Sequence, residues 1–413
     1  MPMNRVVITG RGAVSTFGLG VEKLTEAVRQ GRSGVVFIKE WEHVRGLNSF
    51  LAAPVPPLDI KKLLPRSARR TMGDMAIYAT LAAMEAVDDA GLDREFLESG
   101  QTGASIGSTT GSPGVYEEYY RNFLDEESFQ ELRSGTFFKI MGHSCSANVC
   151  HALKIRGEQW ATAGACSSSS QAIGLGYLLI KSGRQRAMIC GGADEVHHSV
   201  TMVFDILKAA SRNHDPPLHT PAPFDADRDG VVCSGGSGIL VLESLESAQA
   251  RNAEIYAEIL GFGHVTDSDH IANPTEDAMS AAMNQAMLEA SVIKEKIDYI
   301  NAHATGTKHG DITEAQAISR VCGADVPVSS LKGHLGHALG AAGGLETILV
   351  LEMFNRQELL PTLHLKRPDP ACRGINLLQE KQRARVNTVL KNNFALGGVN
   401  TALVLQRWTY DNG

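Results

Sequence analysis

The chain has 413 residues, a formal net charge of −7, 43% hydrophobic residues and 21% charged residues. This length exceeds the usual range for one domain, and the composition is that of a globular protein with a sizeable core. The negative charge disfavours general affinity for nucleic acid or anionic membranes. No apolar run reaches the roughly 18 residues of a membrane span, and the N-terminus lacks the pattern of a secretory signal, so we expect a cytoplasmic protein.

Cysteine and histidine usage argues against a structural metal or a disulfide framework. The seven cysteines are an odd number without CxxC pairs, so reduced thiols are expected. Fourteen histidines are present, but no HExxH motif occurs, and His197 and His198 are adjacent in an expected loop. We therefore predict no bound metal.

The first segment predicts a strand over residues 6–9, a glycine-bearing turn over 10–14 and a helix over 21–29. Position 15 is Ser15 and not the third glycine of a GxGxxG motif. The opening is therefore a βα unit that does not predict a dinucleotide site.

The rest of the chain alternates strand-like and helical stretches. Strands are expected at 102–107, 187–195, 238–243, 255–260, 299–302 and 388–390. Helices are expected at 72–90, 245–253, 279–288, 313–321 and 345–353. Alternation of this kind predicts a mainly parallel, helix-covered sheet in each of two halves, and no clear sequence repeat joins these halves.

One cysteine, Cys166, lies between a short strand-like run and the start of an expected helix. Four serines, 167–170, follow it and suit a first helical turn rich in polar caps. The free N–H groups and the dipole of a helix N-terminus favour a thiolate, so we expect a thiol pKa below roughly 8.5. A cysteine alone is more often buried and inert, so its partners decide.

Two later motifs supply such partners. The segment Asn301–Thr307 contains His303, and the segment Leu331–Gly344 contains Lys332 and, five residues later, His337. Each motif follows a strand-like run and is expected at the same edge of a sheet. With Cys166, these motifs resemble the β-ketoacyl synthases, the condensing enzymes of the thiolase superfamily, and the resemblance runs over residues 6–405.

The resemblance implies an α/β fold of two duplicated βαβαβ halves, stacked as five layers, α-β-α-β-α. The first half, residues 1–253, would carry the nucleophile and insertions for the dimer interface and acyl pocket, and the second half, residues 254–413, the two histidines. It further implies a homodimer whose substrates arrive on the phosphopantetheine of acyl carrier protein, so no other cofactor is expected.

The implied activity is fatty acid elongation by a decarboxylative Claisen condensation between an acyl chain on Cys166 and malonyl-acyl carrier protein. His303 and His337 would hold the malonyl thioester oxygen, Lys332 would support them and Glu314 would orient them. Further implied roles are an oxyanion hole from the N–H groups of Cys166 and Leu396, pantetheine binding by Thr305 and Thr307, an acyl gate at Phe394 and Leu396, and carrier-protein docking at Lys61, Lys62, Arg66, Arg69 and Arg70.

The sequence departs from the family pattern at the gate and at a cation position. The phenylalanine-glycine-phenylalanine loop of the family is Phe394-Ala395-Leu396 here, and Val231 replaces a phenylalanine after the run 223–230. If the loop requires φ > 0 at Ala395, alanine costs on the order of 1 kcal/mol relative to glycine.

Several relatives hold a cation near the positions that match Asn301 and Glu346. Lys391 stands where some of those relatives carry serine, and its positive charge would replace or repel an ion there. This substitution adds to the expectation that no metal binds.

Two other members of the superfamily fit less well. A degradative thiolase uses a second cysteine near the C-terminus, and none follows Cys372. A synthase III uses asparagine where His337 stands. A noncatalytic partner resembling a chain-length factor usually loses the nucleophile. A type II polyketide or aryl-polyene ketosynthase shares the chemistry, so the pathway and the acyl preference stay open.

Overall fold

The computed structural model describes residues 3–128, 130, 133–216 and 218–409. Five strands of the first half are β1 (Val6–Ser15), β5 (Thr102–Gly107), β6 (Gln159–Trp160), β7 (Ala187–Asp194) and β9 (Gly236–Ser244). Five strands of the second half are β10 (Ala257–Thr266), β11 (Tyr299–Asn301), β12 (Pro327–Ser329), β16 (Thr388–Ala395) and β17 (Val399–Arg407). The longer helices are α1 (Val21–Arg29), α4 (Asp74–Ala90), α6 (Pro113–Glu126), α7 (Ser134–Ile140), α8 (Ser144–Leu153), α9 (Ser168–Lys181), α10 (His198–Ile206), α12 (Glu276–Ala290), α13 (Lys308–Cys322) and α15 (Ala342–Arg356).

The two halves repeat one strand order. The first runs β6-β5-β7-β9-β1 and the second β12-β11-β16-β17-β10, and β1 pairs briefly with β10 to join them. In each half the first two pairs are parallel and the last two antiparallel. The prediction of mainly parallel sheets was therefore wrong, because helical crossovers give parallel pairs, whereas a short turn such as that between β16 and β17 makes antiparallel neighbours.

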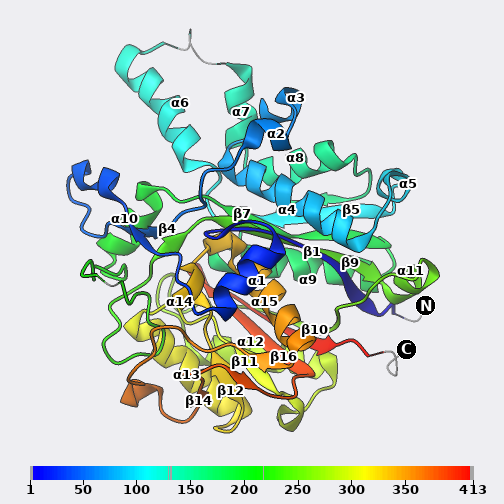
Figure 1. Cartoon of the computed structure of the whole chain (residues 1–413), viewed down its shortest axis with the longest axis vertical. Helices are drawn as coiled ribbons and strands as arrows, with labels where there is room; N and C mark the ends of the chain where they lie inside the picture. The colour runs from blue at the N-terminus through cyan, green and yellow to red at the C-terminus, as the bar shows by residue number, and fades with distance from the viewer. Residues whose placement is uncertain (1–2, 129, 131–132, 217, 410–413) are drawn as a thin grey trace.

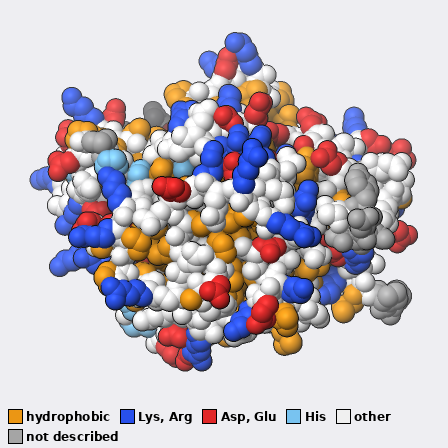
Figure 2. All heavy atoms as spheres, turned by 60° about the horizontal axis from the view of Figure 1, so that its bottom comes forward, with side chains coloured by type: hydrophobic (Ala, Val, Ile, Leu, Met, Phe, Trp, Pro, Cys, Tyr) orange, Lys and Arg blue, Asp and Glu red, His pale blue; other side chains and the backbone are white. Residues whose placement is uncertain are grey.

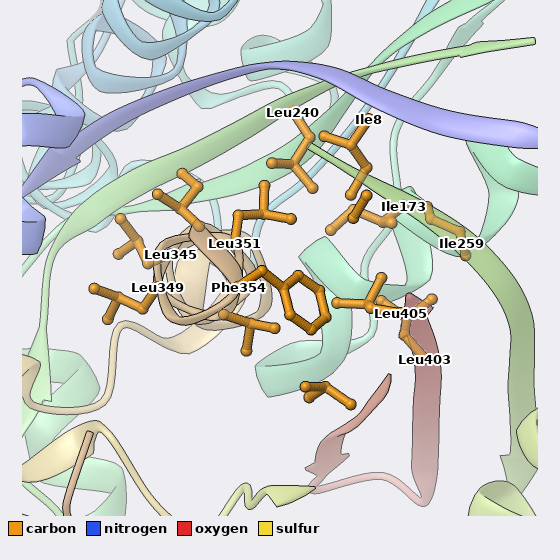
Figure 3. Packing of buried hydrophobic residues seen from close by; sticks show 14 of the residues in the cluster. Ile8, Ile173, Leu240, Ile259, Leu345, Leu349, Leu351, Phe354, Leu403 and Leu405 are labelled. Atoms are coloured by element: carbon orange, nitrogen blue, oxygen red, sulfur yellow. The ribbon is translucent and has the colours of Figure 1, made fainter. Parts of the chain in front are cut away.

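The layers follow the expected α-β-α-β-α order. Helices α4 and α8 cover the outer face of the first sheet, α9 and α15 lie between the sheets, and α12 covers β10 and β17 with α13 beside it (Figure 1). The buried hydrophobic side chains of the middle layer contact strands of both sheets (Figure 3). Examples are Leu345, Leu349 and Phe354 of α15 and Ile173 of α9, against Ile8, Leu240, Ile259, Leu403 and Leu405. The division into two domains at residue 253 stays a prediction.

The two halves share a pattern of small residues, although the sequence alone had shown no clear repeat. A Cβ atom on Gly12 of β1 would overlap the carbonyl oxygen of Ala82 in α4, and one on Gly263 of β10 would overlap that of Ala282 in α12. Both strands thus approach their covering helix so closely that only glycine fits. The repeated pattern is Gly-x-Gly on the strand with alanines four residues apart on the helix.

An arm formed by α6 and α7 projects from the body (Figure 1). It exposes several large apolar side chains, namely Tyr120, Leu124, Phe137 and Phe138. The arm belongs to the first half, which was expected to carry insertions for the dimer interface, and the homodimer itself stays a prediction. Figure 2 shows one face of the molecule, on which basic and acidic side chains are interspersed around apolar patches. Within the described residues, no helix is long and apolar enough to cross a membrane.

Candidate active site

Cys166 occupies a tight turn at the N-terminal end of the buried helix α9. It is the middle residue of a 3₁₀ turn, Ala165–Ser167, and its side chain is buried. Ala165 has φ 46°, a left-handed conformation that residues other than glycine adopt at a cost. The surrounding structure therefore holds the nucleophile in a strained turn.

The serines after Cys166 had been expected to cap the helix through their side chains, but they do not. Instead, the Ser167 hydroxyl donates toward the carbonyl oxygens of Asn393 and Val399, at 3.0 Å in each case. The Ser168 hydroxyl donates to the carbonyl of Ala165 at 2.7 Å. The hydroxyls thus fasten the nucleophile turn to itself and to the β16–β17 hairpin of the second half.

The structure brings the three principal candidates together. His303 follows β11, and His337 follows the short helix α14 (Lys332–Leu335). The sulfur of Cys166 and one ring nitrogen of each histidine all lie within 4.8 Å of one another. The two imidazole rings are 5.2 Å apart and nearly perpendicular, and all three residues line a cavity of 790 Å³.

The thiol differs electrostatically from the expectation. Burial raises the pKa of the Cys166 thiol to about 12, and the charge of Lys332 and the N–H groups of Cys166 and Leu396 only partly oppose this effect. The predicted low pKa is therefore wrong, because desolvation of the thiolate outweighs the helix N-terminus. The same two N–H groups point toward the sulfur, so they lie beside the carbon that the thiol would attack. The oxyanion hole that they are expected to form stays a prediction.

Both imidazoles are neutral near pH 7. Burial, together with the charge of Lys332, lowers the pKa of His303 well below its usual value and that of His337 to about 3. Neither ring nitrogen of His337 has a hydrogen-bond partner among the described residues. His337 can therefore accept a proton from, or donate one to, a molecule in the cavity.

Glu314 and Lys332 support this pair by different routes. The Glu314 carboxylate accepts the backbone N–H groups of His303 at 2.8 Å and Ala304 at 2.6 Å, so it holds the loop and not the ring. Burial raises the pKa of Glu314 to about 7. The Lys332 ammonium is ion-paired with the buried carboxylate of Glu346.

The region of the expected cation contains a second ammonium. Lys391, on β16, is fully buried and lies 3.0 Å from Glu346. Although burial opposes it, the two lysines hold the pKa of Glu346 below its usual value. Nearby, the side-chain oxygen of Asn301 has no partner among the described residues. Sequence reasoning had considered Lys391 but gave no role to Asn393, whose signal was a run of three polar residues, 391–393, in the buried strand β16.

The residues expected to bind pantetheine and to form the acyl gate line the same cavity. The hydroxyls of Thr305 and Thr307 are 3.2 Å apart, and Phe394 and Leu396 border the cavity with Val231. Ala395 ends β16 without a positive φ; the left-handed residues of this turn are Gly397 and Gly398. Alanine is therefore tolerated at position 395 without the backbone strain that glycine would relieve.

The five predicted docking cations lie apart from the cavity lining. They fall on the short helices α2 (Ile60–Leu63) and α3 (Arg66–Arg69) and just after them. Lys62 is ion-paired with Asp59 at 2.8 Å, and Arg69 donates to the carbonyl of Leu64 at 3.1 Å. The exposed members of the set are Lys61, Lys62, Arg66 and Arg70.

A second group of potential metal ligands lies between α6 and α10. Glu117 accepts from His197 at 3.1 Å and from His198 at 3.2 Å, so each of these residues already has a partner. His198 had been expected to lie in a loop, but it is the first residue of α10. The absence of a metal stays a prediction.

Comparison of the sequence with known protein families shows the family to which this chain belongs. The N-terminal domain profile of the β-ketoacyl synthases matches residues 3–248, and their C-terminal domain profile matches residues 256–366. The chain belongs to the β-ketoacyl synthase family. It is 35% identical to 3-oxoacyl-[acyl-carrier-protein] synthase 1 of Haemophilus influenzae, over 98% of this chain and 100% of that protein.

Solved structures agree with this family assignment. A β-ketoacyl synthase from Burkholderia phymatum STM815 superposes with a TM-score of 0.95 at 39% identity, covering 98% of this chain and 100% of that one. A type II polyketide ketosynthase, in complex with its acyl-carrier protein and bound to a hexaketide, superposes with a TM-score of 0.90 at 26% identity, over 98% and 100% of the two chains. This β-ketoacyl synthase thus has the thiolase fold that the resemblance had implied.

Proposed function

We propose that this β-ketoacyl synthase elongates acyl chains on acyl carrier protein by decarboxylative condensation with malonyl-acyl carrier protein, in fatty acid synthesis. The observation that carries the proposal is the meeting of one thiol and two neutral imidazoles, within 4.8 Å of one another, beside two backbone N–H donors. Nucleophile, base and oxyanion donors are the parts that acyl transfer needs.

In the first step, Cys166 attacks the thioester carbon of the acyl-carrier substrate. His337, whose ring nitrogens have no partner among the described residues, takes the thiol proton and returns it to the departing pantetheine thiolate. The tetrahedral oxyanion is held by the N–H groups of Cys166 and Leu396, and removal of one such donor typically costs about 2.7–4 kcal/mol. The acyl chain is then esterified to sulfur and the imidazole is neutral again.

In the second step, malonyl thioester enters and its carboxylate leaves as CO₂. The electrons of the broken C–C bond form an enolate whose oxygen lies between His303 and His337. The enolate carbon attacks the acyl-cysteine carbonyl, and collapse of the new tetrahedral intermediate expels the Cys166 thiolate, which takes a proton from solvent. Thr305 and Thr307 bind the pantetheine arm in both steps.

The proposal includes a homodimer, a cytoplasmic location and docking of acidic carrier protein on the basic residues of α2 and α3. No metal and no cofactor other than the carrier's phosphopantetheine is proposed, since Glu346 already faces two ammonium groups.

A type II polyketide or aryl-polyene ketosynthase is the second candidate. It is favoured by Leu396 and Val231 at the cavity, because smaller side chains than the family's phenylalanines leave room for wide or unsaturated acyl groups. A noncatalytic chain-length factor is disfavoured by the intact thiol and imidazoles.

The test is an assay with malonyl carrier protein and a ladder of acyl primers, read by mass spectrometry. Cys166→Ala is expected to abolish condensation, and Cys166→Gln to decarboxylate malonyl carrier protein without extending a chain. Condensation at the wild-type rate by Cys166→Ala would refute the proposed function. Preference for saturated primers supports the fatty acid pathway, whereas preference for polyunsaturated primers supports the second candidate.

A further inference from the structure

The reaction described above does not use Lys391, yet this lysine is fully buried close to the site. Its ammonium contacts the side-chain oxygen of Asn393, and it lies 3.0 Å from a carboxylate oxygen of Glu346 and 3.4 Å from the hydroxyl of Ser170. A buried ammonium is costly unless its donors are paired. The contact to Asn393 is the one that leads toward the reacting groups.

These contacts leave Asn393 only one amide orientation. Its side-chain oxygen accepts from the ammonium of Lys391 and from the hydroxyl of Ser170. The other terminal atom of the Asn393 amide lies 3.1 Å from a carboxylate oxygen of Glu346. An ionised carboxylate can only accept hydrogen bonds, so this atom of Asn393 must be the NH₂ group. An ammonium has no lone pair to accept a hydrogen bond, so Lys391 would lose this partner if the amide were flipped.

The NH₂ group of Asn393 also faces His303. It lies 3.4 Å from Nδ1 of that imidazole, which must therefore accept a hydrogen bond and carry no proton. A neutral imidazole with a bare Nδ1 carries its proton on Nε2. We propose that Lys391, acting through the amide of Asn393, is a positioning residue that sets the tautomer of His303, so that Nε2–H is presented to the substrate oxygen.

This inference rests on the proposed function and adds to it. An N–H donor aimed at the enolate oxygen stabilises the charge that decarboxylation creates, and the opposite tautomer would aim a lone pair there. Loss of one preorganised donor typically lowers a rate by about 10²–10³-fold. Lys391 and Asn393 are therefore expected to affect decarboxylation more than transfer of the acyl chain to Cys166, whose oxyanion is held by backbone N–H groups.

The decisive variant is Asn393→Asp, which keeps the shape but only accepts hydrogen bonds, and so requires the proton of His303 on Nδ1. Decarboxylation of malonyl carrier protein, measured in the Cys166→Gln background, is expected to fall about 100-fold. Acylation of Cys166 by acyl carrier protein, measured in the otherwise wild-type chain, is expected to change less than about threefold. Equal losses in both half-reactions would indicate a merely structural role and overturn the proposal.

A second variant keeps the test open if Asn393→Asp does not fold. Lys391→Met leaves Asn393 in place but removes the charge that fixes its amide, and a roughly tenfold loss of decarboxylation is expected, as for a weakened donor. Lys181→Met, which removes a lysine paired with Glu289 at 2.7 Å away from the cavity lining, is the matched control and should leave both half-reactions unchanged.

A direct measurement uses ¹⁵N NMR of the ring nitrogens in the full-length wild-type enzyme, with the His303 signals assigned by their loss in His303→Ala. A non-protonated Nδ1 is expected, and a proton on Nδ1 would overturn the inference. If Cys166→Gln with an intact Asn393 does not decarboxylate malonyl carrier protein, the proposed function has failed. If it does and Asn393→Asp is equally active, only the inference has failed.

Discussion

The turns before the two central helices have the same backbone conformation, but they differ in their middle residue. The nucleophile turn, Ala165–Ser167, precedes α9, and the turn Leu339–Ala341 precedes α15. Their first residues are both left-handed, with φ 46° at Ala165 and 49° at Leu339. The middle residue is Cys166 in one turn and Gly340 in the other. The fold therefore provides this strained turn twice, and the chemistry uses it once.

Packing explains why only one of the two turns carries a side chain at its middle position. A Cβ atom on Gly340 would lie 2.6 Å from Oδ2 of Asp194, and the same oxygen accepts the Gly340 N–H at 2.6 Å. In the second half the turn is thus held by a carboxylate of the first half, whereas in the first half it opens to the cavity. The two halves thus share the backbone conformation of this turn, and the contacts between the halves determine which of the two turns can carry a reactive side chain.

The largest expected effect tests whether the halves are structurally equivalent. Gly12→Ala and Gly263→Ala are each expected to lower the free energy of unfolding by about 3 kcal/mol, since the new methyl group overlaps a backbone carbonyl of the covering helix. Denaturant unfolding would measure both. Gly142→Ala, where no heavy atom lies within 4 Å of the new Cβ and φ is not positive, is the control and should change stability by less than about 0.5 kcal/mol. A large effect at only one of the two glycines would break the equivalence.

The second prediction concerns the carboxylate that holds the Gly340 turn. Burial raises the pKa of Asp194 to about 7, so between about pH 4 and 7 the folded protein keeps a proton that the unfolded chain releases. Stability from this group therefore falls as pH rises through that window. An asparagine side chain does not titrate, so Asp194→Asn should gain about 3 kcal/mol relative to wild type between about pH 4.5 and 7.5.

Urea unfolding at the two pH values checks this difference. Glu314, whose pKa burial also raises to about 7, titrates in both proteins and cancels. Parallel stability curves for wild type and Asp194→Asn would show that the carboxylate is already ionised in the folded state.

The third prediction separates the carrier protein from its pantetheine arm, since docking is proposed on the first half and arm binding on the second. Arg66→Glu combined with Arg70→Glu should raise KM for carrier-linked substrates about tenfold, because like charges then repel the acidic partner. Small thioester surrogates should be spared. Lys294→Glu with Lys296→Glu, an equal charge change on exposed residues of the second half, is the control. Equal losses on both substrate types would contradict docking at α3.

The smallest expected effect tests the gate, to which the halves contribute Val231 and Leu396. Leu396→Phe should lower turnover of the bulkiest accepted primers about tenfold more than that of short saturated ones, since an added ring in a packed site costs roughly 1–3 kcal/mol. Competition among primers, read by mass spectrometry, measures the ratio. A uniform change across the ladder would show that this side chain does not select the acyl group.

Local pattern in the sequence was enough to predict the elements and the chemical groups of the site. Apolar periodicity predicted the main helices and strands to within a few residues in most cases, although α13 begins at Lys308 and β16 continues to Ala395. The turn expected over residues 10–14 was wrong, because β1 continues through it to Ser15. Motif resemblance identified Cys166, His303 and His337, which the fold brings together. Periodicity and motif spacing are properties of neighbouring residues, so a single sequence contains them.

Only the tertiary structure decided what those groups experience. The raised pKa of the Cys166 thiol comes from burial by both halves, and the hydroxyl of Ser167 after it binds a hairpin more than 200 positions away. The amide of Asn393 is oriented by Lys391, Ser170 and Glu346, which come from three separate elements. Desolvation and hydrogen-bond partners depend on which distant segments pack together, and no local pattern records that.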